Sequence, residues 1–473
     1  MAIVKRDCPT CVLVGPVLAD MQSTGANVRV ISQDDPTFPD GCSDIIDDRE
    51  LALSWHNDIE TVPTLVRMVD GVETERIVGW SAEQWREFTG QASLGEGLAE
   101  YRPGCGSLSV DPNLAAGLEA KFGGSGLAAR RVEFAVLEDP VEAMYERGWT
   151  DGLPVVPPTV ERVQAMLAGT TRDSSEVIAV VPPDLVECTV EKVAINAVMA
   201  GCKPEYLPVV IAGLQAICTD EFNMHGVLAT TMSVGPIFVV NGPIRSRLGM
   251  NSGINVMGPG NRANSTIGRA VALCVRNVGG GRPGDVDRAT HGQPGKYGLC
   301  FPEQEESSPW EPFASSRPTG AIDAGSNAIT AFCGDGSQCV VDQLSRDPDS
   351  LCRSFAAALR AIHHPKLVIA FDAMLVIGPE HARVFAEAGW DRAEVIETID
   401  RYSEAPGSEL FRGAGGMAEG LPVDLGDQRL AKCRPGGLLI VHAGGGAGLF
   451  SNLIGGWVSG AGGSEPVTVA IGS

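Results

Sequence analysis

Apolar positions recur along the first ninety residues with two different spacings, and these predict alternating strands and helices. The stretches "AIVK" and "NVRVISQD" are typical of short strands, whereas "CVLVGPVLADMQ" and "RELALSWH" carry apolar residues at helical spacing. The stretches "TVPTLVRMVDG" and "ERIVGW" predict a hairpin, and "SAEQWREFTG" predicts a closing helix that starts at Ser81. The predicted order is β-α-β-α-β-β-α, which indicates a first α/β domain over residues 1–92.

From residue 132 onward, continuous apolar runs alternate with helical patterns. The runs "VIAVV", "GPIFVVNGP", "LVIAFDAMLVIGP" and "GGLLIVH" predict strands, and "TVEKVAINAVMAGC" and "NSTIGRAVALCVRNVGG" predict helices. Because such strands are typical of sheets covered on both faces, we predict a large, mainly parallel α/β region. The similar strand ends "VVNGP" and "LVIGP" suggest two related halves, which we place at residues 132–316 and 317–473.

Residues 93–131 are rich in Gly, Ser and Pro and have no sustained periodicity, which predicts a linker between the two regions. Within it, "RPGCGSLS" places Cys105 between two glycines, where a buried structural role is not expected. A reactive thiol and an incidental exposed thiol both stay open for Cys105. A flexible linker could carry it to the first domain or to the large region, and thiol–disulfide exchange needs such contact between sulfurs.

Length, charge and composition limit the classes of protein to which this chain can belong. The 473 residues suffice for about three domains, and the net charge of −23 argues against a nucleic-acid partner. No apolar run approaches the ~20 residues of a membrane helix, and the N-terminus lacks a secretory signal, so we expect a cytoplasmic protein without a membrane partner. In that compartment the 13 cysteines are not expected to form a disulfide scaffold, and Cys218, Cys274 and Cys352 on helical patterns are expected to be structural.

The first two cysteines, Cys8 and Cys11, stand where the first predicted strand gives way to a helix. Free backbone N–H groups and the helix dipole stabilise a thiolate at this position. The sequence therefore predicts a redox-active dithiol, while a pair that only binds a metal or packs stays open as the alternative.

Two motifs in this domain resemble those of the thioredoxin/glutaredoxin superfamily. They are Cys8-Pro9-Thr10-Cys11 after the first strand and Thr61-Val62-Pro63-Thr64 before the hairpin. The resemblance implies a thioredoxin-like fold in which Cys8 attacks, Cys11 resolves the mixed disulfide, and Pro63 is cis and packs against the pair. Arg6-Asp7 replaces the usual Trp before the motif, and "DPTFPDGCSDIID" looks like an insertion, which leaves the reduction potential and the partner open.

In the large region, polar and Gly-rich stretches follow several predicted strands, at the edge where open α/β sheets bind ligands. The loop in "VMGPGNRANSTIGRA" runs into a helix, so that its backbone N–H groups could hold an anion, and "VHAGGGAGLFSN" repeats this arrangement. The loop "HGQPGKYGLCFPEQEESSPW" adds a lysine. The candidate substrate- or anion-binding residues are Gly258, Gly260, Asn261, Arg262, Asn264, Lys296, His442, Gly445 and Gly446.

Candidate catalytic residues of the large region come from two stretches. In "AGCKPEY", Cys202 adjoins Lys203, which would favour a thiolate and a nucleophilic role, although a structural turn stays open. The loop "HGQPGKYGLCFPEQ" gathers His291, Lys296, Cys300 and Glu303, and we take His291 and Glu303 as candidates for proton transfer, with a solvated surface loop as the alternative. His225 and His381 are expected to be structural.

Residues 95–473 also contain phrases similar to those of bacterial U-G-S-C-type (seleno)proteins of unassigned chemistry. Examples are "WTDGLPVVPPT", "GPGNRANSTIGRA" and "GPEHARVFAEAGW", and a distant relation to selenoprotein B of glycine/betaine reductases is suspected. "PGCGS" at Cys105 is similar to the signature with cysteine in place of selenocysteine, and Leu108 stands where its last cysteine would be. The resemblance implies no particular substrate.

Three functions remain. The leading one is a thiol-dependent enzyme whose Cys8/Cys11 module supplies or recycles electrons for a cysteine, first Cys105 and then Cys202, acting on a small molecule, with cleavage of a carbon–heteroatom bond. Its reductant would be thioredoxin or a low-molecular-weight thiol. One alternative is a lyase, hydrolase or transferase that uses a metal or His/Glu groups, with the Cys8/Cys11 pair regulatory. The other is a non-catalytic redox sensor or partner-binding module. No cofactor beyond the dithiol is identified, a metal stays open, and "GLFSNLIGGWVSG" allows either a homo-oligomer or a buried segment.

Overall fold

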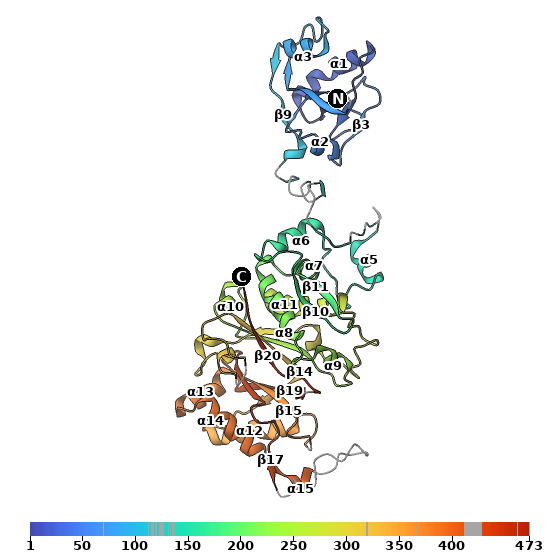
Figure 1. Ribbon diagram of the computed structural model, residues 1–473. Helices are drawn as coiled ribbons and strands as arrows, with labels where there is room; N and C mark the ends of the chain where they lie inside the picture. The colour runs from blue at the N-terminus through green and yellow to red at the C-terminus, as the bar shows by residue number, and fades with distance from the viewer. Residues whose placement is uncertain are drawn as a thin grey trace. The chain divides into compact units, whose positions relative to one another are not determined.

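The computed structural model divides the chain into two compact units, unit 1 (Met1–Leu127) and unit 2 (Ala128–Ser473) (Figure 1). The structure describes the chain apart from residues 70, 112, 115–117, 119–120, 123–126, 131, 133, 135–137, 318–319, 366, 411–427, 461 and 473.

Unit 1 is built on a five-stranded sheet with the order β3-β2-β1-β5-β6. Its first three strands are parallel, and the hairpin of β5 and β6 adds to β1 in the antiparallel direction. The strands are β1 (Ala2–Val4), β2 (Val30–Ser32), β3 (Ile46–Asp47), β5 (Thr64–Val69) and β6 (Val72–Val78), and the helices are α1 (Pro9–Ser23), α2 (Ala52–His56) and α3 (Ala82–Thr89).

Local signals in the sequence account for the ends of the unit 1 helices. Ser81 is the N-cap of α3, because its side chain accepts a hydrogen bond from the Gln84 N–H, as predicted from the sequence. Gly90 ends the same helix with a φ of 71°, a left-handed conformation that suits glycine. Trp80 and Trp85 are fully buried and pack edge to face at 5.0 Å, which anchors this end of the core.

The first part of the predicted linker is an integral part of unit 1. Residues Tyr101–Arg102 form β8, which pairs with β7 (Trp80–Ser81), and Cys105–Gly106 form β9, which pairs with β4 (Thr61–Val62). Further on, the Ser107 N–H donates to the Glu60 carbonyl. Much of the remaining predicted linker, from residue 112 onward, lies outside the described residues.

Unit 2 is organised around one seven-stranded sheet, in the order β13-β12-β14-β19-β15-β18 with β20 beside β14. Among the described residues, the pairs β12–β13 and β15–β18 of this sheet are parallel and its other four pairs are antiparallel, so the prediction of a mainly parallel sheet is wrong. The apolar runs indicated that both faces of the strands are buried. Such burial does not depend on whether neighbouring strands are parallel or antiparallel. The strands are β12 (Gly235–Asn241), β13 (Cys300–Pro302), β14 (Ala328–Val341), β15 (Phe371–Ile377), β18 (Leu438–His442), β19 (Phe450–Val458) and β20 (Val467–Ala470).

The strand order of this sheet is symmetric about the β14–β19 pair. On each side, an antiparallel strand leads to a parallel pair, β12–β13 on one side and β15–β18 on the other. The similar stretches "VVNGP" and "LVIGP" end the equivalent strands β12 and β15, in keeping with two related halves. The sheet is nevertheless continuous across the predicted boundary at 316/317, because β12 pairs with β14.

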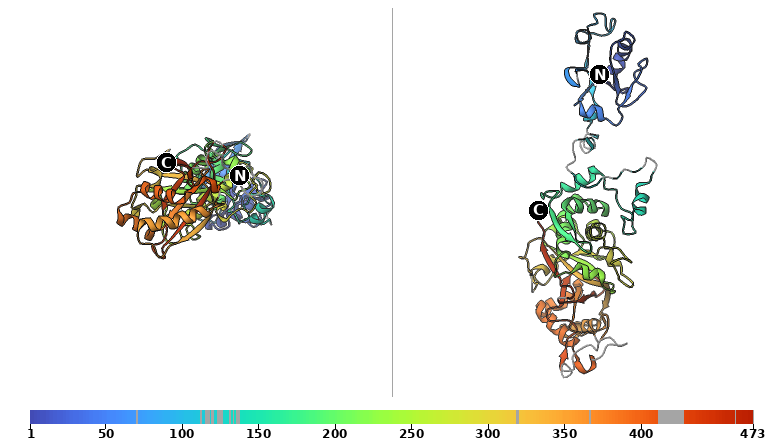
Figure 2. Two further views of the ribbon diagram at one scale, coloured as in Figure 1. Left: turned by 90° about the horizontal axis from the view of Figure 1, so that it is seen from below. Right: turned by 45° about the vertical axis from the view of Figure 1, so that its right-hand side comes forward.

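Two groups of helices accompany the two halves of the sheet. Helices α7 (Val190–Ala200), α8 (Leu207–Ile217) and α11 (Arg262–Asn277) lie toward the green half, and α12 (Pro348–Ala361), α13 (Pro379–Ala388) and α14 (Arg392–Ser403) toward the orange half (Figures 1 and 2). The described part of unit 2 also contains the α-helices α5 (Pro140–Glu146), α6 (Val160–Leu167), α9 (Met224–Ala229), α10 (Ile244–Arg247) and α15 (Gly407–Leu410) and the strands β10 (Val177–Val181), β11 (Val186–Thr189), β16 (Ala405–Pro406) and β17 (Arg429–Leu430).

The sheet of unit 2 curls around its own core. One cluster of buried side chains draws members from both edge strands and from the four strands between them, including Phe301 of β13 and Leu439 of β18. The two edges meet where the strands end, since the Gln304 N–H donates to the His442 carbonyl at 2.8 Å. Loops that follow these strands are therefore gathered at one end of the sheet.

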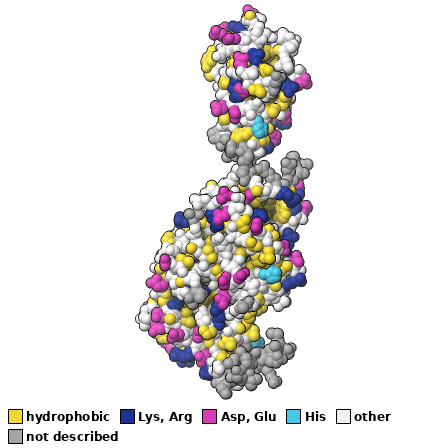
Figure 3. Space-filling model, viewed as in Figure 1, with side chains coloured by type: hydrophobic (Ala, Val, Ile, Leu, Met, Phe, Trp, Pro, Cys, Tyr) yellow, Lys and Arg dark blue, Asp and Glu magenta, His cyan; other side chains and the backbone are white. Residues whose placement is uncertain are grey.

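Two observations on the described residues concern the charge of the surface and the prediction that no helix crosses a membrane. Acidic and basic side chains are interspersed over the face shown in Figure 3. Among the helices in the described ranges, none combines the length and the apolar character that crossing a bilayer requires.

Candidate functional site

The two cysteines of the first motif lie where β1 passes into α1. Cys8 is the N-cap of α1 with an extended backbone, and its sulfur accepts a hydrogen bond from the Cys11 N–H at 3.4 Å. The positive end of the helix dipole is directed toward the same sulfur. Local sequence thus creates a position at which a thiolate is stabilised.

The thiol groups around Cys8 reinforce this effect. Hydrogen bonds from the Cys11 side chain, and to a smaller extent from Cys105, lower the pKa of Cys8 to about 5. Burial and the same contact with Cys8 raise the pKa of Cys11, and burial likewise raises that of Cys105. At neutral pH the cluster therefore holds a Cys8 thiolate between two protonated thiols.

The second motif lies against the first. In its thiol form, Cys8 donates to the Val62 carbonyl oxygen at 3.6 Å, and the Val62–Pro63 peptide bond is cis. Val62 is paired with Cys105 across the β4–β9 ladder. The structure thus brings together Cys8, Cys11, Pro63 and Cys105, all of which the sequence marked as candidates.

Cys105 is held at this site by a close-packed segment. The Thr10 hydroxyl donates to the Pro103 carbonyl at 2.7 Å. A Cβ atom on Gly104 would lie 2.4 Å from the Thr61 Cγ2 atom and 2.8 Å from the Val62 oxygen, so glycine is required for this approach. Cys105 itself is half-buried, whereas the sequence had suggested an exposed thiol on a flexible linker.

In unit 2, the two Gly-rich loops line a common pocket of about 450 Å³. The pocket brings Gly258 together with Gly445 and Gly446, three of the predicted ligand-binding residues. The loops meet because the Gly444 N–H donates to the Ser252 carbonyl at 2.9 Å. The remaining wall comes from the ends of β15 and β19, including Asn452.

The polar side chains of the first loop hold its shape. Asn261 is the N-cap of α11 and accepts from the Asn264 N–H. The buried Asn264 side chain donates to the carbonyls of Asn251 and Val256 and accepts from the Asn251 N–H. The amide side chains of Asn261 and Asn264 are thus engaged in hydrogen bonds within the protein.

Two other candidates of this loop lie away from the pocket lining. The Arg262 guanidinium donates to the Gly201 carbonyl at 2.8 Å and so caps the end of α7. Gly260 has a φ of 122°, which explains the glycine by backbone conformation.

A serine and a histidine form a hydrogen-bonded pair at the pocket wall. Ser451 lines the pocket, although it is buried, and its hydroxyl lies 2.8 Å from Nδ1 of His381. Nε2 of His381 lies 3.1 Å from the Asp342 carbonyl oxygen, which can only accept. The proton therefore belongs on Nε2, and Nδ1 accepts from the Ser451 hydroxyl. Burial lowers the pKa of His381, which favours this neutral ring.

Ser451 was not predicted from the sequence, and His381 was expected to be structural. Two signals were present: Ser451 directly follows the second Gly-rich loop in "GLFSN", and His381 follows the "LVIGP" strand end. Neither signal shows that the two residues meet. The Gly378 N–H also donates to the Ser451 hydroxyl, at 3.2 Å.

Cys202 has the environment of an unreactive thiol. It is buried and its sulfur donates to the Thr266 carbonyl at 3.4 Å. Burial raises its pKa to about 12. The neighbouring Lys203 ammonium lies instead 3.8 Å from the Glu205 carboxylate, and both side chains are about half-exposed. These contacts favour the protonated thiol.

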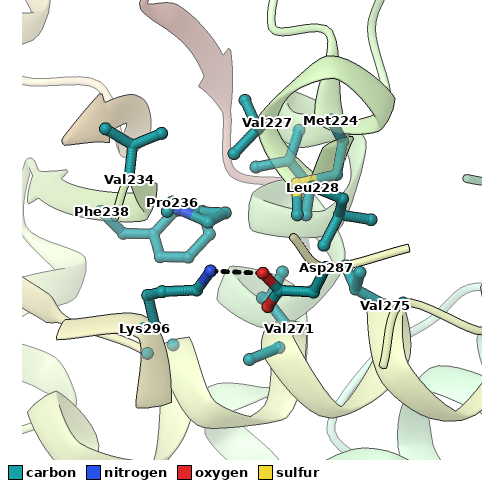
Figure 4. Close-up of a pocket in the computed structure, with 16 residues that line it drawn as sticks. Met224, Val227, Leu228, Val234, Pro236, Phe238, Val271, Val275, Asp287 and Lys296 are labelled. Carbon is teal, nitrogen blue, oxygen red and sulfur yellow. Dashed lines mark hydrogen bonds and ion pairs between the residues drawn. The ribbon is translucent and has the colours of Figure 1, made fainter. Parts of the chain in front are cut away.

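Lys296 lines a second, smaller pocket of about 80 Å³ (Figure 4). Its ammonium forms an ion pair with Asp287 at 2.8 Å, and apolar side chains such as Met224, Leu228 and Phe238 surround the pair. His291 is exposed, and Cys300 is buried in β13. The residues of this loop, which were predicted from the sequence to form one group, thus lie in different surroundings.

Glu303 is fully buried beside the end of β12. Its Oε2 atom accepts from the Asn241 side chain and from the Phe313 N–H, both at 2.6 Å, and its Oε1 atom lies 3.6 Å from the Arg392 guanidinium. Burial raises the pKa of Glu303 despite these contacts. His442 is also buried, and its Nδ1 atom lies 2.9 Å from the Gln304 carbonyl oxygen. Neither residue lines the pocket of the Gly-rich loops.

Within the described ranges, no group of three or more His, Cys, Asp or Glu side chains is arranged to hold a metal ion. Comparison of the chain with models of protein families, with curated proteins and with solved structures found no match.

Proposed function

We propose that this protein is a thiol-dependent enzyme whose N-terminal unit is a thiol–disulfide oxidoreductase module. The observation that carries the proposal is the Cys8 sulfur at the start of α1, which accepts from the Cys11 N–H and has a pKa of about 5. The thiolate is the reactive form in disulfide exchange, and here it is the stable form at neutral pH.

The two cysteines of the motif have distinct roles in this proposal. The Cys8 thiolate attacks a sulfur of an oxidised substrate, and a mixed disulfide forms as the leaving thiolate departs. Cys11 then loses its proton and attacks the Cys8 sulfur, which releases the reduced substrate and leaves a Cys8–Cys11 disulfide. A thiol reductant, either thioredoxin or a low-molecular-weight thiol, returns the pair to the dithiol.

The larger unit would supply the site for a small molecule. Its pocket of about 450 Å³ falls within the range of ~300–1,000 Å³ that is typical of small-molecule sites. Tethering the dithiol to this unit raises its effective concentration for any oxidised group formed there. The thioredoxin-like resemblance of the first motif and the fusion of the two units both support this division of labour.

Redox titration of the full chain tests the proposal. The protein is equilibrated against glutathione buffers, and the Cys8/Cys11 disulfide is followed by alkylation and mass spectrometry. We expect a two-electron couple that joins Cys8 and Cys11 in the unaltered chain. The matched control is Cys339→Ser, which should keep this couple, because Cys339 is exposed and belongs to unit 2. Failure of the unaltered chain to form the Cys8–Cys11 disulfide at any glutathione potential would refute the proposal.

The His381–Ser451 pair favours a second candidate, a hydrolase or transferase with a serine nucleophile in which the Cys8/Cys11 pair is regulatory. A neutral histidine that accepts from a serine hydroxyl can take up its proton during attack on a carbonyl group. A fluorophosphonate probe distinguishes this candidate: it should label Ser451 and fail to label Ser451→Ala or His381→Ala. Absence of labelling in the unaltered protein would exclude it.

A further inference from the structure

A short segment of unit 1 closes over the Cys8/Cys11 pair. We call residues 101–106 the strap. Its first half pairs with β7, through Trp80 and Arg102, and its second half pairs with β4, through Val62 and Cys105. Between them, the Pro103 carbonyl accepts from Thr10, a residue of the dithiol motif itself. The strap is therefore held at both of its ends, and between them it is hydrogen-bonded to the dithiol motif.

The strap shields the dithiol from other molecules. Cys8 is only 1% exposed and Cys11 is not exposed at all. The sulfur of Cys8 is surrounded by the Cys11 N–H, the Val62 carbonyl and the thiol of Cys105. An external disulfide can reach Cys8 only when the strap moves away, whereas Cys105 is already in contact with it.

The strap also uses the strand edge at which an extended partner would bind. Exposed strand edges bind extended peptides through backbone hydrogen bonds. At β4 this edge, formed by Thr61 and Val62, is taken by Cys105 and Gly106 of the same chain. A cysteine thus stands on the bound segment directly beside the attacking thiolate.

We propose that Cys105 is the built-in disulfide partner of Cys8, and that the strap is an internal substrate segment which gates access to the dithiol. This inference rests on the proposed function of the Cys8/Cys11 module and deepens it. It assigns the resolution of the first mixed disulfide to a cysteine of the same chain and makes the centre a three-thiol centre.

The exchange balances with a small-molecule disulfide, R–S–S–R, as oxidant. When the strap opens, the Cys8 thiolate attacks one sulfur, R–S⁻ leaves, and Cys8–S–S–R forms. The Cys105 thiol gives its proton to that R–S⁻, and its sulfur attacks Cys8 as the second R–S⁻ leaves and takes a proton from water. Two R–SH molecules and a Cys8–Cys105 disulfide result.

Cys11 completes this series of thiol–disulfide exchanges. Its sulfur attacks Cys8, the bond between Cys8 and Cys105 breaks, and the Cys11 proton passes to Cys105. The products are a Cys8–Cys11 disulfide and a free Cys105 thiol. Cys105 therefore stays in a disulfide with Cys8 only for as long as Cys11 is prevented from reacting.

Removal of Cys11 makes the intermediate observable. The full-length Cys11→Ser chain is treated with one equivalent of 4,4′-dithiodipyridine, digested without reduction, and its disulfides are mapped by mass spectrometry. We expect a peptide pair joined through Cys8 and Cys105. In Cys11→Ser with Cys105→Ser we expect the thiopyridyl group to remain on Cys8. If Cys11→Ser keeps the thiopyridyl group on Cys8 with Cys105 free, the proposal is overturned; Cys11→Ala serves in its place should the serine variant not fold.

The gate is tested separately through Gly104 of the strap, with Gly462 of unit 2 as the matched control. Gly104→Ala places a Cβ atom against Thr61 and Val62, whereas a Cβ atom on Gly462 meets nothing within 4 Å. We expect Gly104→Ala to speed the reaction of Cys8 with 4,4′-dithiodipyridine by about tenfold or more, because a larger fraction of molecules is open. Gly462→Ala should react as the unaltered chain does. Equal rates for both variants would contradict a gating role.

The two proposals fail in different ways. Loss of the proposed function appears as the absence of a Cys8/Cys11 redox couple in the titration. Failure of the present inference appears as an intact couple together with a Cys105 that stays reduced in Cys11→Ser.

Discussion

Val62 and Cys105 face one another across the short antiparallel ladder of β4 and β9. Because Val62 adjoins Pro63 and its carbonyl oxygen lies 3.6 Å from the Cys8 sulfur, this pairing puts a third thiol beside the two of the Cys-Pro-Thr-Cys motif. The chemistry that we propose for unit 1 rests on that arrangement.

The reactivity of Cys8 should depend on pH through its neighbours. A pKa of about 5 means that the rate of alkylation by iodoacetamide rises through pH 5 and is level by about pH 7. Cys105→Ala and Cys11→Ala each remove a thiol donor to the thiolate, so both should move the midpoint upward, Cys11→Ala by more. Peptide-resolved alkylation measures these midpoints, and an unchanged midpoint in both variants would show that the thiol contacts do not act on Cys8.

Cys202 should be silent in the same experiment. Burial raises its pKa to about 12, so less than about one molecule in a thousand carries the thiolate below pH 9. We expect Cys202 to resist iodoacetamide in the folded chain and Cys202→Ser to keep the redox couple of unit 1. Alkylation of Cys202 at a rate near that of Cys8 would contradict this prediction and support Cys202 as a nucleophile.

Glu303 should link the stability of unit 2 to pH. Its pKa in the folded state is raised above the ordinary 4.5, so its contribution is fully present below pH 4.5 and is lost as the pH rises through the folded-state pKa. Glu303→Gln should remove this loss while keeping the hydrogen bonds from Asn241 and Phe313 within reach. Urea unfolding between pH 4 and 8 measures the difference, and parallel profiles for the two proteins would contradict it.

Glu303→Ala should have a larger effect than Glu303→Gln. It leaves the Arg392 guanidinium, which is 11% exposed, without the carboxylate at 3.6 Å. Removal of one partner of a buried ion pair costs about 3–5 kcal/mol. Far-UV circular dichroism during urea unfolding gives the value, with Glu161→Ala, an exposed acidic residue of α6, as the control.

The pocket of the Gly-rich loops should depend on Asn264. Asn264→Ala removes the donors to the Asn251 and Val256 carbonyls and the acceptor of the Asn251 N–H. Because each buried polar group left without a partner costs about 1–3 kcal/mol, we expect a loss of unfolding free energy of at least about 1 kcal/mol. Asn113→Ala, at an exposed position, is the control. Equal stabilities of the two variants would contradict the assigned role of Asn264.

Local features of the sequence determined much of unit 1. The position of Cys8 at a helix start, the N-cap Ser81 and the hairpin after Pro63 all follow from patterns that span only a few residues. Such patterns report burial, capping and turns, which are settled by neighbours in the chain. The Gly-rich loops at strand ends were located for the same reason.

Tertiary structure decided what these elements meet. The apolar runs of unit 2 showed that its strands are buried, but only the sheet shows that most of its pairs are antiparallel. Cys105 and Val62, like Ser451 and His381, are far apart in sequence, and pairing across such distances depends on the whole fold. Cys202 was expected in a turn between two helices and Glu303 in a polar loop. Both are buried in the structure, because burial depends on neighbours that the local sequence does not contain.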